Sequence, residues 1–313
     1  MPLDPHVARF LALLAASGTV STASVSVDER RRGLAALMKF SGPPPRVACV
    51  DTLAVPGRHG PIPIRVYTPI DSTGELLAGL VYFHGGGLVA GSILTHDAIA
   101  CELADAGRCK VVSVDYRLAP EHPFPAAVDD ALSATVHIAE NAAAYGIDGT
   151  RLGVCGDSAG ATLAAATAHT MTRTCRHPLG LQLLLCPILD WSRPTPSRRE
   201  LAHGFLVDQE MLDHDLRHYV PAGCSLSDPR ISPLCAENHA GLPVTFIHTA
   251  EYDPLRDEGA EYAARLSAAG CRVSLTCHAG MIHLFYGLQS VVPYARRGFE
   301  QIGLQIRGTL ETG

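Results

Sequence analysis

One serine in this sequence has neighbours that could make it a nucleophile. Ser158 lies at the centre of Gly-Asp-Ser-Ala-Gly, residues 156–160, which matches the pattern G-x-S-x-G. A strand-like run precedes the motif and an alanine-rich, helix-like run follows it. Glycines on both sides permit a crowded strand-to-helix turn that would expose the hydroxyl at the start of a helix. The same pattern also arises by chance in loops rich in glycine and serine.

An acidic residue further along the chain could orient a histidine toward this hydroxyl. Asp253 follows a predicted strand and precedes a predicted helix, on a loop marked by Pro254. A carboxylate held on such a loop is well placed to orient an imidazole ring. Asp257 and Glu258 are nearby rivals, but we expect both on the helix, where acidic side chains suit the N-terminus.

The histidine that best fits the role of base is His283. It lies in a loop after the predicted strand at residues 272–278, within reach of other strand ends. His278 ends that strand, and we expect it to be held in or beside the sheet. The chain order Ser158, Asp253, His283 is that of α/β-hydrolase triads. This order favours a catalytic interpretation of His283 over an ordinary structural one.

A glycine-rich loop could supply the third part of an acyl-transfer site. Residues 84–87, His-Gly-Gly-Gly, directly follow an apolar strand-like run. Phosphate binding is disfavoured, because the Lys-Ser/Thr of a phosphate loop is missing and the dinucleotide spacing is not met. Backbone N–H groups aimed at one point can instead stabilise a tetrahedral oxyanion. We predict donors at Gly85, Gly86 and Ala159, with a simple tight turn as the alternative for the glycines.

The order of elements predicts how these residues come together. Short apolar strands alternate with helices, which predicts a mostly parallel sheet covered on both faces. Ligands of such sheets bind at the carboxyl ends of the strands. Residues 190–222 break the alternation and look inserted. The helices that we expect are two within residues 1–40, separated by a polar break near 17–26, and then 95–107, 124–145, 159–172, 257–269 and 293–310.

Composition excludes several classes of function. The 313 residues carry a net charge of −6 and no long basic run, which argues against a nucleic-acid partner. No stretch approaches the roughly 20 apolar residues of a membrane span. The ten cysteines form no C-x-x-C and the histidines no H-E-x-x-H. We therefore expect no metal and no organic cofactor, and reduced thiols in a cytoplasmic protein.

Taken together, the motifs resemble those of a bacterial member of the hormone-sensitive-lipase-like family of α/β-hydrolase esterases. The similarity runs over nearly the whole chain. The segments that carry it, besides His283, are the glycine loop, "DYRLAPEHPFPA" at 115–126, "GDSAG" at 156–160, "DPRISPL" at 228–234 and "DPLRDE" at 253–258. Each motif alone is weak, whereas their combination is highly specific.

The resemblance implies an α/β-hydrolase fold with a mostly parallel central sheet, helices on both faces and a helical cap. Residues 46–189 and 223–313 would form the catalytic domain, and residues 1–45 and 190–222 the cap. It also implies the roles predicted above: Ser158 as nucleophile, Asp253 as acid and His283 as base, with oxyanion amides at Gly85, Gly86 and Ala159.

The implied activity is hydrolysis of small carboxylic esters with short-to-medium acyl chains through an acyl-enzyme intermediate. An amidase, deacetylase or formamidase could use the same triad. A non-catalytic receptor on this fold is less favoured, because it would be expected to lose a triad member. A homodimer is one arrangement open to the chain.

Two expectations concern the surroundings of the site. Arg117 and Glu121 could form a buried charge pair beneath the glycine loop. The residues that could line an apolar acyl pocket, or equally pack the cap on the core, are Leu88, Phe205, Leu206, Met211, Leu212, Tyr219, Leu284 and Phe285. Leu88 departs from the family pattern, which usually has an aromatic residue after the glycines.

Overall fold

One mixed sheet runs through the centre of the protein. The computed structural model describes residues 1–16, 25–70, 76–174 and 177–310. Within these ranges eight strands form a sheet in the order β1-β2-β4-β3-β5-β6-β7-β8. Their bounds are β1 Cys49–Gly57, β2 Gly60–Thr68, β3 Leu77–Phe83, β4 Lys110–Val114, β5 Ile147–Asp157, β6 Leu181–Leu185, β7 Val244–Tyr252 and β8 Val273–Ile282.

The strand directions confirm the predicted, mostly parallel sheet. β1 and β2 form an antiparallel hairpin, and β2 pairs antiparallel with β4. All remaining pairs, from β4 and β3 across to β7 and β8, are parallel. The carboxyl ends of these parallel strands therefore meet at one edge of the sheet, where open α/β sheets bind their ligands.

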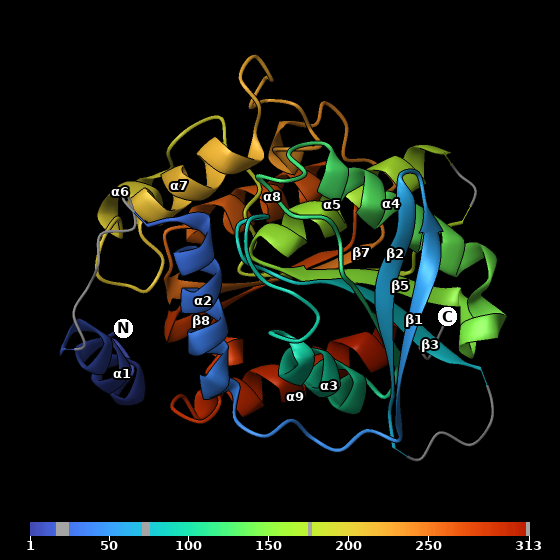
Figure 1. Cartoon of the computed structure of the whole chain (residues 1–313), viewed down its shortest axis with the longest axis horizontal. Helices are drawn as coiled ribbons and strands as arrows, with labels where there is room; N and C mark the ends of the chain where they lie inside the picture. Colours follow the sequence, from blue (N-terminus) through green and yellow to red (C-terminus); the bar gives the residue numbers. More distant parts are fainter. Residues whose placement is uncertain (17–24, 71–75, 175–176, 311–313) are drawn as a thin grey trace.

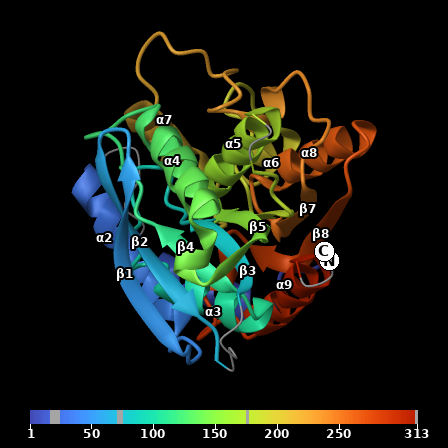
Figure 2. The same cartoon turned by 90° about the vertical axis from the view of Figure 1, so that its right-hand side faces the viewer.

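Helices cover both faces of this sheet. In Figures 1 and 2, α4, α5 and α8 lie on one side and α3 and α9 on the other. Side chains alternate between two cores along β3: Val81 and Phe83 join the first, and Leu80 and Tyr82 the second. The helical bounds are α1 Pro5–Ala16, α2 Val27–Leu37, α3 Asp97–Gly107, α4 Ala126–Glu140, α5 Ala159–Thr174, α6 Pro196–Glu200, α7 Gln209–Tyr219, α8 Arg256–Ala268 and α9 Tyr294–Leu310, with 3₁₀ turns η2 Met38–Ser41, η3 Ala142–Tyr145, η4 Pro233–Cys235 and η5 Phe285–Gly287.

Two helical segments far apart in the chain come together beside the sheet. α2 begins at a capping box in which Ser26 and Glu29 bond each other's backbone amides. α7 begins at Asp208, whose side chain accepts from the amide of Met211. An ion pair between Arg30 of α2 and Asp215 of α7 joins the two helices. The polar break expected near 17–26 lies mostly outside the described residues.

Strand β8 is longer than the sequence suggested. The predicted strand at 272–278 continues to Ile282, after an irregularity in its pairing with β7 between Ala250 and Tyr252. Tyr252 then pairs with Ile282. As a result Asp253 and His283 each directly follow the last residue of neighbouring parallel strands, which the shorter predicted strands did not reveal.

The predicted pairing of Arg117 with Glu121 is wrong. Nη2 of Arg117 lies 2.8 Å from Oδ1 of Asp130, a buried residue on α4. Glu121 is more than half exposed and pairs with Arg31 of α2 at 2.6 Å. The reason is that α4 begins close to Arg117 in the chain and places Asp130 in reach, while Glu121 points toward the N-terminal helices.

Candidate active site

A strained turn presents Ser158 at the carboxyl end of β5. Its backbone has φ 52°, in the left-handed region, between the end of β5 and the start of α5. A Cβ atom on Gly156 would lie 2.2 Å from the carbonyl oxygen of Gly160. One on Gly160 would lie 2.0 Å from the carbonyl oxygen of Phe83. Both positions therefore exclude any side chain, which is the physical reason for G-x-S-x-G here.

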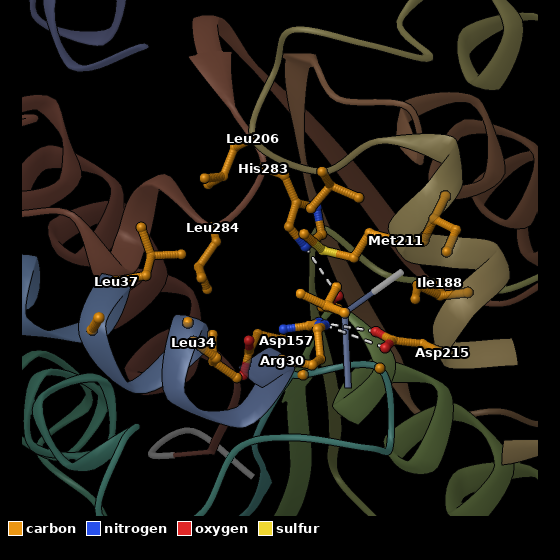
Figure 3. A pocket seen from close by; sticks show the side chains of 18 of the residues that line it. Arg30, Leu34, Leu37, Asp157, Ile188, Leu206, Met211, Asp215, His283 and Leu284 are labelled. Carbon is orange, nitrogen blue, oxygen red and sulfur yellow. Dashed lines mark hydrogen bonds and ion pairs between the residues drawn. The ribbon is translucent and has the colours of Figure 1, made fainter. Parts of the chain in front are cut away.

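Three side chains predicted from the sequence meet at this turn. Nε2 of His283 lies 3.0 Å from Oγ of Ser158, and Nδ1 lies 2.8 Å from Oδ2 of Asp253; Figure 3 shows His283 over the cavity. Because a carboxylate only accepts hydrogen bonds, Nδ1 carries the proton and Nε2 presents its lone pair to the hydroxyl. Asp253 is fully buried, and its Oδ1 accepts from the amide of Leu255 at 2.9 Å.

The rival acids and the rival histidine have other partners. Glu258 is fully buried and accepts from the amides of Leu189 and Asp190. It also pairs with Arg198 of α6 at 2.7 Å, although burial keeps its pKa above the usual value. Asp257 accepts from the amide of Ser197 at 2.8 Å. These two acids thus attach the inserted segment to α8 rather than serve the site.

His278 belongs to a separate cluster next to β7. Its Nε2 lies 2.9 Å from Nδ1 of His248, and its Nδ1 lies 3.1 Å from the hydroxyl of Tyr294. Burial, together with a smaller contribution from the neighbouring His248, lowers the pKa of His278 to about 3. This ring therefore stays neutral and structural, as expected for a side chain held beside the sheet.

The glycine loop contacts the nucleophile turn, but the amide of its first glycine does not have the predicted role. The amide of Gly85 donates to Oδ1 of Asp157 at 2.9 Å, and the hydroxyl of Tyr82 donates to the same oxygen at 2.5 Å. The amide of Gly85 therefore already has an acceptor, which corrects the prediction that it is an oxyanion donor. Gly86 and Gly87 instead line the cavity that contains Ser158. Among the described residues, neither of their amides has a hydrogen-bond acceptor.

Sequence reasoning missed the roles of Asp157 and Gly87. Asp157 is buried and ties the nucleophile turn to the glycine loop, and a Cβ on Gly85 would lie 2.3 Å from its Oδ2. The available signal was an acidic residue inside an otherwise small and apolar motif. For Gly87 the signal was the third consecutive glycine, which has φ 68° in the structure.

Cys186 lies closer to the triad than its apolar sequence context indicated. Its sulfur and the nearest atoms of Asp253 and His283 all lie within 4.8 Å of one another. Burial and the neighbouring Asp253 carboxylate raise the pKa of the Cys186 thiol well above its usual value. The group is therefore a protonated thiol packed against the acid, and the other two members of this cluster belong to the predicted triad.

A cavity of about 380 Å³ opens onto Ser158 and His283. Helix α2 forms one wall and the inserted segment with α7 another, as Figure 3 shows for Leu34, Leu37 and Met211. Four of the predicted pocket residues line it: Leu206, Met211, Leu212 and Leu284. The contribution of α2 was missed, because its lining residues are spaced along a helix whose sequence is dominated by charges.

The other four predicted pocket residues lie outside this cavity. Leu88 is fully buried in the hydrophobic core. Tyr219 packs edge-on against Phe124, with ring centroids 6.0 Å apart. The remaining two pack against aromatic neighbours, Phe205 against Tyr252 and Phe285 against Tyr286. Tyr219 and Phe285 are fully buried, which is more favourable for their rings than exposure at an open cavity.

Comparisons with known proteins agree with this geometry. Residues 80–287 match the model of a protein family whose description is "alpha/beta hydrolase fold". Carboxylesterase NlhH of Mycobacterium tuberculosis is 43% identical over 238 residues, which cover 75% of this chain and 74% of that protein. An ethyl acetate hydrolase of Pseudomonas putida is 34% identical over 311 residues, covering 96% and 98%.

A solved structure extends the likeness to the whole chain. The ester-hydrolase EH1AB1 from the metagenome of Lake Arreo, complexed with a derivative of bipyridine phosphonate, superposes with a TM-score of 0.95. It is 37% identical, and the match covers 98% of each chain. The fold, the family match and these relatives together establish that the chain belongs to the α/β-hydrolase family, in its hormone-sensitive-lipase-like branch.

Proposed function

We propose that the chain is a serine carboxylic ester hydrolase in which Ser158 is the nucleophile, His283 the general base and Asp253 the residue that orients it. One observation carries the assignment of roles: a single imidazole bridges the Ser158 hydroxyl at 3.0 Å and the buried Asp253 carboxylate at 2.8 Å. The esterase relatives support the class of reaction.

The reaction follows from this arrangement in two steps. Ser158 Oγ attacks the ester carbonyl carbon while Nε2 of His283 takes its proton. The tetrahedral intermediate collapses, the C–O bond to the alcohol breaks, and His283 returns the proton to the leaving alkoxide. Water then attacks the acyl-enzyme while His283 takes its proton. The bond between Ser158 Oγ and the acyl carbon breaks, the acid leaves, and His283 returns the proton to Oγ. Asp253 stabilises the imidazolium that forms in each step.

The oxyanion donors in this proposal are the amides of Gly86, Gly87 and Ala159. Gly86 and Gly87 line the same cavity as Ser158, and Ala159 is the first residue of α5. The N-terminal end of α5 adds a favourable dipole for the developing negative charge. Gly87 takes the place of Gly85, because the amide of Gly85 already donates to Asp157.

The proposed substrates are small esters with short-to-medium acyl chains. Residues 1–45 and 190–222 act as a cap in this proposal, since α2 and α7 wall the cavity with apolar side chains. The name of the Pseudomonas putida relative, an ethyl acetate hydrolase, supports a short-chain substrate. The catalytic domain would then comprise residues 46–189 and 223–313.

The decisive experiment compares Ser158→Ala with the unchanged protein on p-nitrophenyl esters from acetyl to dodecanoyl. We expect the highest kcat/KM between acetyl and octanoyl, and a loss of about a thousandfold in the variant. Retained turnover in Ser158→Ala would reject the nucleophile. Matched anilides, assayed alongside, would reveal an amidase if they were cleaved at comparable rates.

The compartment and the assembly complete the proposal. No helix of the described residues has both the length and the apolar character of a membrane span. We propose a cytoplasmic location, which the scattered cysteines without any C-x-x-C pattern favour. Cell fractionation with an ester assay tests this location, and light scattering of the purified protein distinguishes a monomer from the homodimer that the chain allows.

A further inference from the structure

A buried ion pair forms part of the wall of the reaction cavity. Arg30 of α2 contacts Asp215 of α7 through two hydrogen bonds, Nε to Oδ1 at 3.2 Å and Nη2 to Oδ2 at 2.9 Å. Their side chains are only 10% and 3% exposed. Both residues line the same cavity as Ser158 and His283, and Figure 3 shows the pair across the cavity from His283.

The carboxylate of this pair lies against the glycine loop. A Cβ atom on Gly87 would lie 1.8 Å from Oδ2 of Asp215, so only the missing side chain allows the approach. Gly87 is also one of the proposed oxyanion donors. A full negative charge is therefore held beside the backbone where the reaction would develop a second negative charge.

His214 is a second donor beside the Asp215 carboxylate, in addition to Arg30. Nδ1 of His214 lies 3.1 Å from Oδ1 of Asp215, and its Nε2 lies 3.1 Å from the carbonyl oxygen of Val25. The other acids that line the cavity have partners of their own: Glu29 bonds Ser26, and Asp157 accepts from Tyr82 and Gly85. Arg30 is thus the guanidinium that faces Asp215 within the described residues.

The electrostatic consequence has a definite sign. In a water-poor site, like charges a few ångströms apart repel strongly, and the energy of a developing oxyanion responds to every fixed charge nearby. Asp215 alone would raise the energy of the tetrahedral intermediate. Paired with Arg30, its charge is largely cancelled at the glycine loop. Replacing Asp215 by a neutral residue while keeping Arg30 would leave an uncancelled positive charge, which would lower the energy of the tetrahedral intermediate.

We propose that Arg30 is a positioning residue for ester hydrolysis: by holding and neutralising the Asp215 carboxylate, it keeps the oxyanion loop free of an opposing charge. This proposal rests on the proposed function, because it needs an oxyanion at Gly86 and Gly87. It also gives the contact between the two cap segments a catalytic consequence. Only when α2 and α7 are docked together is the carboxylate of α7 compensated at the reaction centre.

A charge cycle tests this idea. The variants are Arg30→Met, Asp215→Asn, the double variant and Arg30→Lys, with Arg32→Met as a control that removes the same charge from an exposed position of α2. With p-nitrophenyl acetate we expect Arg30→Met to lower kcat by about 10- to 100-fold with a smaller change in KM. Asp215→Asn should keep or raise kcat, the double variant and Arg32→Met should stay within about threefold of the unchanged protein, and Arg30→Lys should keep most of the kcat of the unchanged protein.

The kcat of the double variant distinguishes an effect of charge from an effect of packing. A double variant as slow as Arg30→Met, or an Asp215→Asn variant that loses as much kcat as Arg30→Met, would overturn the proposal, because a packing role loses activity from either side. Thermal unfolding and far-UV circular dichroism give the folded fraction for each rate. If Arg30→Met does not fold, Arg30→Gln takes its place under the same criteria. Failure of the proposed function appears separately, as turnover retained by Ser158→Ala.

Discussion

The amide of Gly85 donates a 2.9 Å hydrogen bond to the carboxylate of Asp157, the residue directly before the nucleophilic serine of the proposed mechanism. The hydroxyl of Tyr82, on β3, donates to the same oxygen. This contact fixes the glycine loop against the nucleophile turn, although 72 positions separate the two residues in the chain. The groups that would stabilise the oxyanion are thereby held in a constant relation to Ser158.

Removing this link should disturb both stability and catalysis. Asp157→Ala leaves a buried amide and a buried hydroxyl without their acceptor, which costs about 1–3 kcal/mol for each unsatisfied group. We expect a lower midpoint of urea unfolding and a loss of kcat of about 10-fold or more as the loop loosens. Asp157→Asn keeps one acceptor oxygen and serves as the control. Equal losses in the two variants would argue against a role for the acceptor.

The close approach at Gly87 predicts an asymmetry between two glycine substitutions. In Gly87→Ala the new methyl group would meet Asp215 at a residue with φ 68°, so the loop must move. We expect kcat to fall by about 100-fold or more through displaced oxyanion donors. Gly308→Ala, in α9 with open space around its Cβ position, should keep activity and gain up to about 1 kcal/mol of stability. Full activity in Gly87→Ala would contradict the assignment of this amide.

The cavity wall predicts which residue controls acyl-chain length. Met211 lines the cavity, so Met211→Trp should fill part of it and lower kcat/KM for octanoyl esters by about 10-fold or more while acetyl esters are affected less. Phe205→Leu changes a side chain that packs on Tyr252 outside the cavity and should leave the chain-length profile unchanged. The measurement is kcat/KM across the p-nitrophenyl ester series. A shifted profile in Phe205→Leu, or none in Met211→Trp, would place the acyl chain elsewhere.

Buried histidines predict a loss of stability in mild acid. Burial lowers the pKa of His169 to about 3, with His239 adding to the effect, against about 6.5 in an unfolded chain. Below about pH 6.5 the unfolded state therefore binds a proton at His169, whereas the folded state does not. The free energy of unfolding consequently falls as the pH drops from about 6.5 toward 3.

A variant at this position isolates the contribution. His169 lies 3.1 Å from the hydroxyl of Tyr262, and His169→Gln preserves a hydrogen-bonding group without a titrating ring. Between pH 6.5 and 4, the free energy of unfolding of the unchanged protein should fall more steeply than that of the variant, by up to about 1.4 kcal/mol per pH unit. Urea titrations at several pH values measure both slopes. Parallel slopes would mean that His169 takes up its proton without a folding penalty.

The sequence alone determined those features of the protein that depend on neighbouring residues. Gly156 and Gly160 bracket Ser158 because that turn has no space for side chains, and this requirement is visible in five consecutive letters. The alternation of strands and helices likewise follows from local hydrophobic patterns. Together they predicted the parallel sheet and drew attention to Asp253 and His283.

Only the tertiary structure decided which partner each polar or aromatic group takes. The amide of Gly85 donates to Asp157 and not to an oxyanion, and Arg117 pairs with Asp130 and not with Glu121. Arg30 and Asp215 are 185 positions apart, and the residues around each of them do not predict that the two will pair. Such choices depend on which surfaces the folded chain brings within a few ångströms. Local propensity carries no information about that distance, because it is set by the packing of whole elements on the sheet.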